Sequence, residues 1–176
     1  MQYLVLSQLD VKLPSIKQMI DGSLNHFWKI SYGQIYPTLK LLVDKGYASF
    51  QAKTQEGKPD KIEYYITPEG ERTLKLWLQQ PIQQLPTEKN ELLLKLFFSR
   101  HQDLPTTLHH LDTYYEKLIS RHRTYQGVKE MITTCLIDQE DAPFWIITID
   151  YGLRVSQAAI DWCKDTKKSL LKQKED

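Results

Sequence analysis

A short stretch of the chain combines hydrogen-bonding side chains with the spacing of a helix. In "SYGQIYPTLKLLVDKG", residues 31–46, the apolar Ile35, Leu39 and Leu42 recur at intervals of three or four, which is typical of one buried helix face. The positions between them carry hydrogen-bonding side chains, namely Tyr32, Gln34, Tyr36, Thr38 and Lys40. These groups complement the donors, acceptors and methyl groups that base edges expose in a major groove. A helix face that is only solvated has the same composition, so both interpretations remain open.

Lysines gather around this segment, although the chain as a whole is close to neutral, with a formal net charge of +1. Residues 29–61 contain six lysines and three acidic residues, whereas residues 81–176 contain 13 bases and 14 acids. A nucleic-acid contact surface requires such a local excess of positive charge, and an excess of this size also arises by chance.

The sequence lacks the motifs on which an enzyme assignment would rest. It contains no GxSxG, HExxH, Walker phosphate loop or dinucleotide fingerprint. His109 and His110 are adjacent, so on a helix they point to different faces and cannot act as an i, i+4 metal pair. Glu88 and Glu91 share a face near a helix start, where a carboxylate is expected for structural reasons. We therefore predict no catalytic residues, no metal and no cofactor.

Three helices are expected in the N-terminal part of the chain. The apolar spacing predicts a short helix over residues 3–9 and a second over about 14–22. Ser31 is a candidate N-cap for the third helix, and Gly46 is a natural stop. Pro37 removes a backbone donor inside this third helix, which predicts a local bend near Gly33.

From residue 47 the hydrophobic period changes from that of a helix to that of a strand. "YASFQAK" and "KIEYYIT" alternate apolar and polar residues on either side of "TQEGKPD", which predicts a two-stranded hairpin with a charged tip. Thr67 is a candidate cap for a following helix that begins at Pro68 and has Leu74, Trp77 and Leu78 on its buried face.

This order of elements predicts a mainly α fold that starts with a winged helix-turn-helix, in which the hairpin is a two-stranded β-wing. The third helix of that fold enters the major groove. The lysines of the hairpin, Lys53, Lys58 and Lys61, are expected to contact neighbouring phosphates, which sets register and salt dependence rather than sequence preference.

The stretch "QQPIQQLP" interrupts the pattern and predicts a domain boundary. We expect a DNA-binding domain over residues 1–80, a linker over 81–87 and an α-helical dimerisation domain over 88–176. In the second domain "NELLLKLFF" is apolar almost all round, which predicts a helix enclosed on several sides. A longer helix follows, with an a/d seam of Leu108, Leu111, Tyr115, Leu118, His122 and Tyr125. His122 is therefore interpreted as a core or interface histidine.

The last helix, from about residue 143 to 172, carries two apolar stripes on opposite sides. One consists of Phe144, Ile147, Tyr151, Val155, Ala158 and Trp162, and the other of Ile146, Ile149, Leu153, Ile160 and Cys163. Two apolar faces need two partners, so we expect a second copy of the chain as one of them, with the first stripe as the candidate dimer interface. The sequence does not decide which stripe faces the copy, and burial within the monomer is the alternative.

Three aromatic residues of this helix are candidates for a second role. Trp145, Tyr151 and Trp162 are candidates for lining an effector pocket between lobes or subunits, with aromatic core packing as the alternative.

The chain has no sequence features of export or membrane insertion. No apolar run approaches the roughly 20 residues that cross a bilayer, and the N-terminal "MQYLVLSQLD" lacks the basic start and the cleavage site of a signal peptide. Only two cysteines are present, Cys135 and Cys163, without CxxC spacing. We therefore expect a cytoplasmic protein without membrane association.

Long stretches of the sequence resemble a known family of regulators. "SLNHFWKISYGQIYPTLKLLVDKGYA" and "GKPDKIEYYITPEGERTLKLWL" closely resemble the DNA-binding domain of the PadR family of bacterial transcriptional regulators. "NELLLKLFF" and "FWIITIDYGLRVSQAAIDWC" are similar to the C-terminal helical domain of the longer PadR subgroup, which includes AphA-like regulators. Within this resemblance, "DVKLPSI" lacks the glycine and tyrosine that usually precede the second helix, which leaves the boundaries of the first two helices open.

The resemblance implies a homodimer that is joined through its C-terminal helices and represses transcription by occupying a pseudo-palindromic operator in double-stranded DNA. It implies groove-facing roles for Ser31, Tyr32, Gln34, Tyr36 and Lys40, with Lys58 and Lys61 on the wing. Some relatives respond to small phenolic acids, so a small aromatic effector is a further expectation. The alternative is a winged-helix module that binds another protein without sequence-specific DNA binding, and its binding would depend less steeply on salt.

Overall fold

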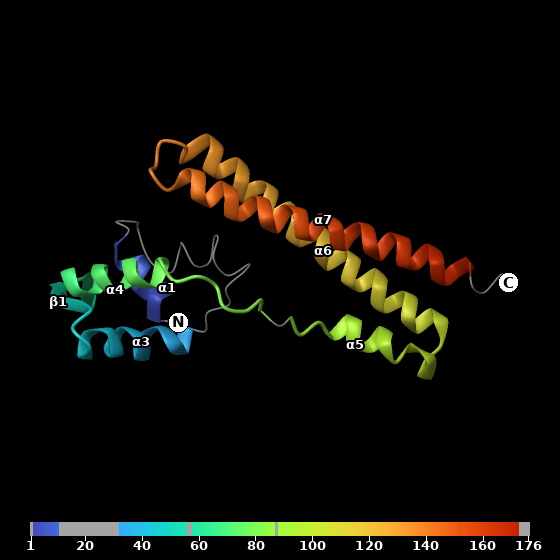
Figure 1. Cartoon of the computed structure of the whole chain (residues 1–176), viewed down its shortest axis with the longest axis horizontal. Helices are drawn as coiled ribbons and strands as arrows, with labels where there is room; N and C mark the ends of the chain where they lie inside the picture. Colours follow the sequence, from blue (N-terminus) through green and yellow to red (C-terminus); the bar gives the residue numbers. More distant parts are fainter. Residues whose placement is uncertain (1, 11–31, 56–57, 87, 173–176) are drawn as a thin grey trace. The chain divides into compact units, whose positions relative to one another are not determined.

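The computed structural model describes residues 2–10, 32–55, 58–86 and 88–172 of the chain, which separate into two compact units, Met1–Leu85 and Pro86–Asp176. The first unit contains α1 (Gln2–Asp10), α3 (Tyr32–Asp44), the strands β1 (Ala48–Gln55) and β2 (Lys58–Ile66), and α4 (Pro68–Leu78) (Figure 1). The second contains α5 (Glu91–Phe97), the short 3-10 helix η2 (Ser99–His101), and the long helices α6 (Leu104–Cys135) and α7 (Ala142–Lys172). None of the described helices is long and apolar enough to span a membrane.

The core of the first unit is a small apolar cluster to which every described element of the unit contributes. It consists of Val5, Leu6, Leu39, Leu42, Ala48 and Leu74, with β2 adding the partly buried Tyr64 and Ile66. The first, third and fourth helices expected from the sequence are therefore present around one core. The helix expected over about 14–22 lies outside the described residues.

The hairpin pairs apolar residues with apolar residues along one face. Its antiparallel register places Ala48 opposite Ile66, Phe50 opposite Tyr64 and Ala52 opposite Ile62. The strands are longer than the sequence suggested, because β1 extends to Gln55 and β2 begins at Lys58. Most of "TQEGKPD" was expected to form a loop, and this was wrong. The antiparallel ladder continues through these turn-forming residues, with an irregularity between Lys53 and Gln55.

One threonine joins the ends of α3, the hairpin and α4. The Thr67 hydroxyl donates a hydrogen bond to the carbonyl of Gly46 at 2.7 Å and accepts one from the N–H of Gly70 at 3.1 Å. Its own backbone N–H donates to the carbonyl of Tyr47 at 3.1 Å. Thr67 is thus the N-cap of α4, as predicted, with Pro68 in the first turn.

The C-terminus of α3 reaches this junction through a glycine. Gly46 has a φ of 73°, the left-handed conformation that glycine adopts without strain. Its N–H bonds the carbonyl of Val43, and the N–H of Tyr47 bonds that of Leu42, both at 2.9 Å. These two bonds form a Schellman motif, which ends α3 and starts the chain toward β1.

The buried face of α4 is narrower than predicted. Leu74 is buried, but Trp77 remains partly exposed with its ring stacked on Tyr3 at a centroid distance of 4.9 Å, and Leu78 is 66% exposed. The expectation that Leu78 is buried was wrong, because α4 ends at this residue and the apolar cluster reaches no further than Leu74.

In the second unit, α6 and α7 form an antiparallel pair whose buried positions recur every seven residues (Figure 1). On α6 these are Leu111, Leu118, Tyr125 and Ile132, and on α7 they are Ala142, Ile149, Ser156 and Cys163. Both long helices were predicted, and Leu111, Leu118 and Tyr125 of the predicted seam are buried. The seam is a heptad contact within one chain.

Polar groups interrupt this pair at its middle. Nδ1 of His122 lies 2.9 Å from Oγ of the buried Ser156, which also donates to the carbonyl of Gly152 at 2.7 Å. His122 is therefore a half-buried residue of the seam. On the neighbouring turn the ring of Tyr125 occupies the space beside Gly152, where a Cβ would lie 2.9 Å from the ring.

The helix α5 is less enclosed than its sequence indicated. Asn90 caps it and donates from Nδ2 to the hydroxyl of Tyr114 on α6 at 3.0 Å. Leu92 is buried and Leu96 packs against the same cluster, but Leu93, Leu94, Phe97 and Phe98 are exposed. The predicted enclosure on several sides is therefore wrong for a single copy of the chain.

Replacement of Gly70 by alanine tests the junction at Thr67. A Cβ at this position would lie 2.1 Å from the backbone oxygen of Tyr47, so α4 must move away from the hairpin. We expect Gly70→Ala to lower the free energy of unfolding by about 2–3 kcal/mol, measured by urea denaturation. Gly127→Ala on α6 is the matched control, because nothing lies within 4 Å of its Cβ position. The control should gain about 0.5–1 kcal/mol from helix propensity, and equal effects of the two changes would contradict a tight junction.

Candidate nucleic-acid interface

The inner face of α3 is fixed by the core, which determines what the helix presents outward. Leu39 and Leu42 are buried, and Ile35 and Val43 pack against the same cluster. The helix ends at Asp44, close to the predicted stop. Because these residues occupy one side, the remaining positions must face away from the core.

The outward face of α3 carries three of the predicted DNA contacts. Gln34 and Lys40 are exposed, and Tyr36 is 75% exposed. Tyr36 and Lys40 are one turn apart on the same flank, whereas Gln34 lies about 160° from Tyr36 around the helix axis. Ser31 lies outside the described residues, and Tyr32 begins the helix without a described side chain.

Pro37 lies inside α3 and is exposed between these two flanks. Thr38 was counted among the outward polar residues, and this was wrong: it is 8% exposed. Its hydroxyl donates to the carbonyl of Gln34 at 2.7 Å, so its polar group is satisfied within the helix. The outward surface therefore consists of Pro37 flanked by Gln34 on one side and by Tyr36 and Lys40 on the other.

The hairpin brings two of the predicted phosphate-binding lysines to one level of the wing. Lys53 on β1 is the cross-strand partner of Lys61 on β2, and Lys58 begins β2 opposite Gln55. The structure describes their backbone positions rather than their side chains.

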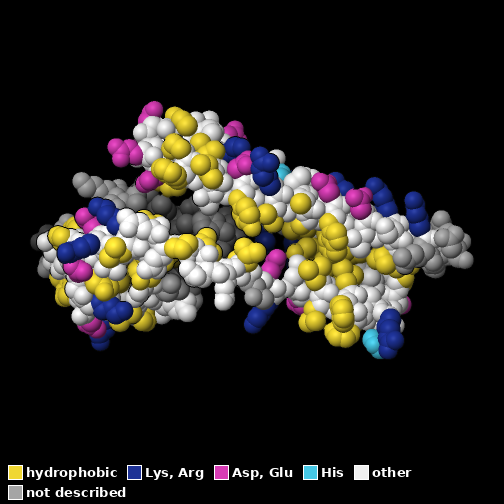
Figure 2. Space-filling view, in the orientation of Figure 1, with side chains coloured by type: hydrophobic (Ala, Val, Ile, Leu, Met, Phe, Trp, Pro, Cys, Tyr) yellow, Lys and Arg dark blue, Asp and Glu magenta, His cyan; other side chains and the backbone are white. Residues whose placement is uncertain are grey.

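The first apolar stripe of α7 reaches the surface of the second unit. Phe144, Ile147 and Tyr151 are 66–68% exposed, Val155 and Ala158 are exposed as well, and Trp162 is 38% exposed. Three residues of the other stripe, Ile149, Ile160 and Cys163, are buried in the same unit. The structure therefore assigns the second stripe to packing within the chain and leaves the first uncovered. Figure 2 shows hydrophobic side chains at the surface where α6 and α7 join.

The three aromatic candidates for an effector pocket do not gather within one chain. Trp145 is half-buried, whereas Tyr151 and Trp162 are exposed on the first stripe. At 1.5 Å per residue, Trp145 and Trp162 are about 25 Å apart along the helix axis. A small aromatic molecule cannot contact both in one copy of α7.

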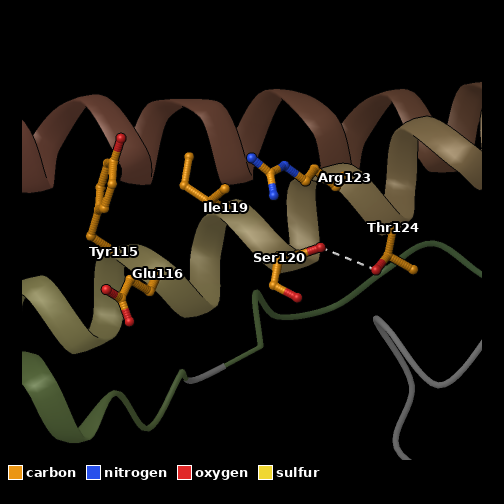
Figure 3. Close-up of a pocket in the computed structure, with 6 residues that line it drawn as sticks. All are labelled: Tyr115, Glu116, Ile119, Ser120, Arg123 and Thr124. Carbon is orange, nitrogen blue, oxygen red and sulfur yellow. Dashed lines mark hydrogen bonds between the residues drawn. The ribbon is translucent and has the colours of Figure 1, made fainter.

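A hollow of about 560 Å³ lies instead along α6, and the sequence analysis did not identify it. Tyr115, Ile119 and Arg123 line one edge at intervals of four residues, and Glu116, Ser120 and Thr124 follow beside them (Figure 3). The Thr124 hydroxyl donates to the carbonyl of Ser120 at 3.1 Å. The hollow thus combines a guanidinium, a carboxylate, hydroxyl groups and an apolar side chain. Only the i, i+4 spacing of Tyr115, Ile119 and Arg123 hints at it in the sequence, and such spacing is common on helices.

Groups that would indicate catalysis do not converge among the described residues. No three His, Cys, Asp or Glu side chains of this part of the chain lie close enough together to hold a metal ion. Cys135 is exposed and Cys163 is buried, and burial raises the pKa of the Cys163 thiol. A buried thiol with a raised pKa is a poor nucleophile.

Both parts of the chain match known protein families. Residues 5–76 match the transcriptional regulator PadR-like family, and residues 88–170 match the family described as virulence activator alpha C-term. Over 77 residues the chain is 40% identical to the negative transcriptional regulator PadR of Bacillus subtilis. That alignment covers 43% of this chain and 41% of that protein.

Solved structures extend the likeness over almost the whole chain. The structure of Bacillus subtilis PadR in complex with operator DNA matches with a TM-score of 0.83 and 23% identity, covering 96% of this chain and 98% of that one. The same protein in complex with p-coumaric acid matches with a TM-score of 0.76 and 21% identity, covering 96% and 97%. The Vibrio cholerae virulence activator AphA matches with a TM-score of 0.73 and 22% identity, covering 98% of each chain.

At these identities the solved structures establish the fold, and they confirm the predicted mainly helical class with an N-terminal winged helix-turn-helix and a C-terminal helical part. The two family matches account for both units and confirm the resemblance read from the sequence. Residues 5–76 thus form a domain of the PadR-like family of transcriptional regulators, and residues 88–170 form a second domain of the virulence activator alpha C-terminal family.

Proposed function

We propose that the chain acts in the cytoplasm as a homodimeric repressor that places α3 in the major groove of a pseudo-palindromic operator. One observation carries this proposal: the outward face of α3 is polar and exposed, and Thr67 holds it beside a long hairpin. A relative with the same fold has been solved in complex with operator DNA. DNA binding is therefore favoured over a winged-helix module that binds only protein.

The two flanks of α3 suit a groove about 12 Å wide. When the ridge at Pro37 points into the groove, Gln34 faces one wall, and Tyr36 with Lys40 faces the other. A glutamine amide can pair with adenine in a bidentate manner, and lysine donates to the acceptors of guanine. The tyrosine ring adds a flat apolar surface for a thymine methyl group. In this arrangement sequence preference arises mainly from Gln34 and Lys40.

The wing contributes affinity rather than base discrimination. Because Lys53 and Lys61 are cross-strand partners, a phosphate at this level of the wing would meet two lysines at once. Each phosphate contact releases counterions, so binding should weaken steeply with salt. Lys58, at the start of β2, extends this surface toward the end of the hairpin.

The dimer follows from the uncovered stripe of α7. Exposed apolar patches of this kind mark association surfaces in proteins. A two-fold axis across the stripe makes the interface self-complementary and pairs each residue with a symmetry-related position. The two α3 helices would then enter half-sites that are one or two helical turns apart, about 34–36 Å per turn.

A small aromatic acid is the proposed effector class, because p-coumaric acid binds a relative of the same fold. Calorimetry with p-coumaric acid should give a saturable heat, and the ligand should lower operator affinity. Loss of the heat in Arg123→Gln would assign binding to the hollow on α6, and its loss in Trp162→Phe would assign binding to the aromatic residues of α7. Flat heats with p-coumaric acid and its hydroxylated analogues would contradict this proposal.

Gln34→Ala tests base recognition by α3. The loss of one bidentate base contact should weaken binding to the selected operator by about 1–3 kcal/mol, while binding to random duplex changes little. Tyr36→Ala should weaken operator binding as well, because its exposed ring supplies apolar contact on the other flank. Gel-shift titration against both duplexes measures the two losses. Gln126→Ala, an exposed glutamine on α6, is the matched control, and equal losses on both duplexes would contradict base readout.

Lys58→Ala tests the wing. The removal of one phosphate contact should weaken binding to all sequences alike, and should make the slope of log K against log salt concentration shallower by about 0.9. Fluorescence anisotropy between 50 and 300 mM salt provides the slope. Lys168→Ala on α7 removes the same charge from the other unit and should leave the slope unchanged. An unchanged slope for Lys58→Ala would remove this lysine from the phosphate-binding surface.

A further inference from the structure

Leu41 is a large apolar side chain on the outward side of α3. It is 43% exposed, whereas its neighbour Leu42 is fully buried. Ile35 and Val43 are the partly buried residues of α3 that pack against the core of the unit, and Leu41 is not among them. The described part of the fold therefore gives Leu41 no place in that core, and its exposed surface is available for contact with a bound molecule.

The position of Leu41 around the axis of α3 places it on the flank of Gln34. At about 100° per residue, Leu41 lies about 20° from Gln34 and about 40° from Pro37. Tyr36 and Lys40 belong to the other flank, because they lie about 140° and 100° from Leu41. The helix makes two turns between Gln34 and Leu41, about 10 Å along its axis. These two residues thus form one row of outward side chains, polar at its first position and apolar at its second.

The chemistry of base edges limits what an apolar side chain in this row can recognise. In the major groove the apolar group that sets one base apart is the C5 methyl of thymine, and the other groups are hydrogen-bond donors and acceptors. A leucine offers no partner to a donor or an acceptor, and an unsatisfied polar group costs free energy when it is buried. A leucine that faces base edges therefore favours thymine, because it gains apolar contact with the methyl group.

We propose that Leu41 reads a thymine methyl group on the same side of the major groove as the base that Gln34 recognises. This inference rests on the proposed operator binding by α3 and deepens it, because it adds a base preference to one flank. A distance of about 10 Å along the groove spans about two to three base pairs, which sets the separation of the two bases. The exposed ring of Tyr36 faces the other wall, so its contacts involve a different base.

Operator variants that lack single methyl groups test this contact without altering the protein. The probe is a duplex that the full-length chain selects from random double-stranded oligonucleotides. Each of its thymines is replaced in turn by deoxyuridine, which lacks only the C5 methyl, and fluorescence anisotropy gives Kd for each duplex. One replacement should weaken binding of the wild-type chain about four-fold, the effect of exposing one methyl-sized group. A parallel selection with Gln34→Ala identifies the base from which the separation is counted.

Leu41→Ala assigns the sensitive methyl group to one side chain. The variant should bind the selected duplex about five-fold more weakly. It should also lose its sensitivity to deoxyuridine at this position, because two groups in direct contact are not additive in a double-mutant cycle. The circular dichroism spectrum should stay unchanged, since alanine favours a helix at least as much as leucine. Leu76→Ala on α4, which removes another exposed leucine of the same unit, is the matched control and should retain both affinity and sensitivity.

Three results would overturn this inference and leave the proposed operator binding intact. In the first, the selected duplex contains no thymine whose methyl group affects binding at the expected separation. In the second, the sensitivity to deoxyuridine persists in Leu41→Ala. In the third, Tyr36→Ala rather than Leu41→Ala abolishes it, which would assign the methyl group to the other flank. A chain that selects no duplex from the random pool would overturn the proposed function and this inference together.

Discussion

The hydrogen bonds of Thr67 are the constraint on which the position of the wing beside α3 depends. Its hydroxyl bonds Gly46 at the end of α3 and Gly70 at the start of α4, and its N–H bonds Tyr47 just before β1. Both ends of the hairpin are therefore held at one place. A change in this junction would therefore alter the position of the wing relative to α3. The residues that fix the geometry of recognition are thus separate from those that would contact DNA.

The second unit uses a polar contact for a comparable purpose. The Ser156 hydroxyl donates to the carbonyl of Gly152 and lies 2.9 Å from Nδ1 of His122, so it links the two helices within the seam. A shift of α7 by one heptad along α6 would separate Ser156 from His122. The buried hydroxyl and the imidazole would then each lose this hydrogen-bonding partner. A single polar position in an apolar seam is a known means of fixing register. The register of α6 and α7 in turn decides where the exposed stripe lies relative to α5.

Local patterns in the sequence were enough to predict much of this structure. The spacing of Leu39 and Leu42 predicted α3, and Thr67 and Gly46 marked helix ends because capping depends on adjacent residues. The errors concern longer-range effects. The turn-forming residues near the hairpin tip belong to the antiparallel ladder. Thr38 is buried by the fold of the unit, and its hydroxyl is hydrogen-bonded within α3. The positions of the lysines on the wing follow from strand register, which composition alone does not specify.

The error at α5 has a different origin and is informative for that reason. A helix that is apolar on all sides indicates that its side chains are buried in the functional form of the protein, either by the same chain or by a partner. The structure of one copy reports only the burial that its own residues provide. Where the two disagree, as at Phe97 and at Ile147, side chains that the sequence pattern assigns to an apolar contact are exposed in the fold of one copy. Both disagreements fall in the second unit, on helices that the sequence alone had linked to a second copy or to enclosure.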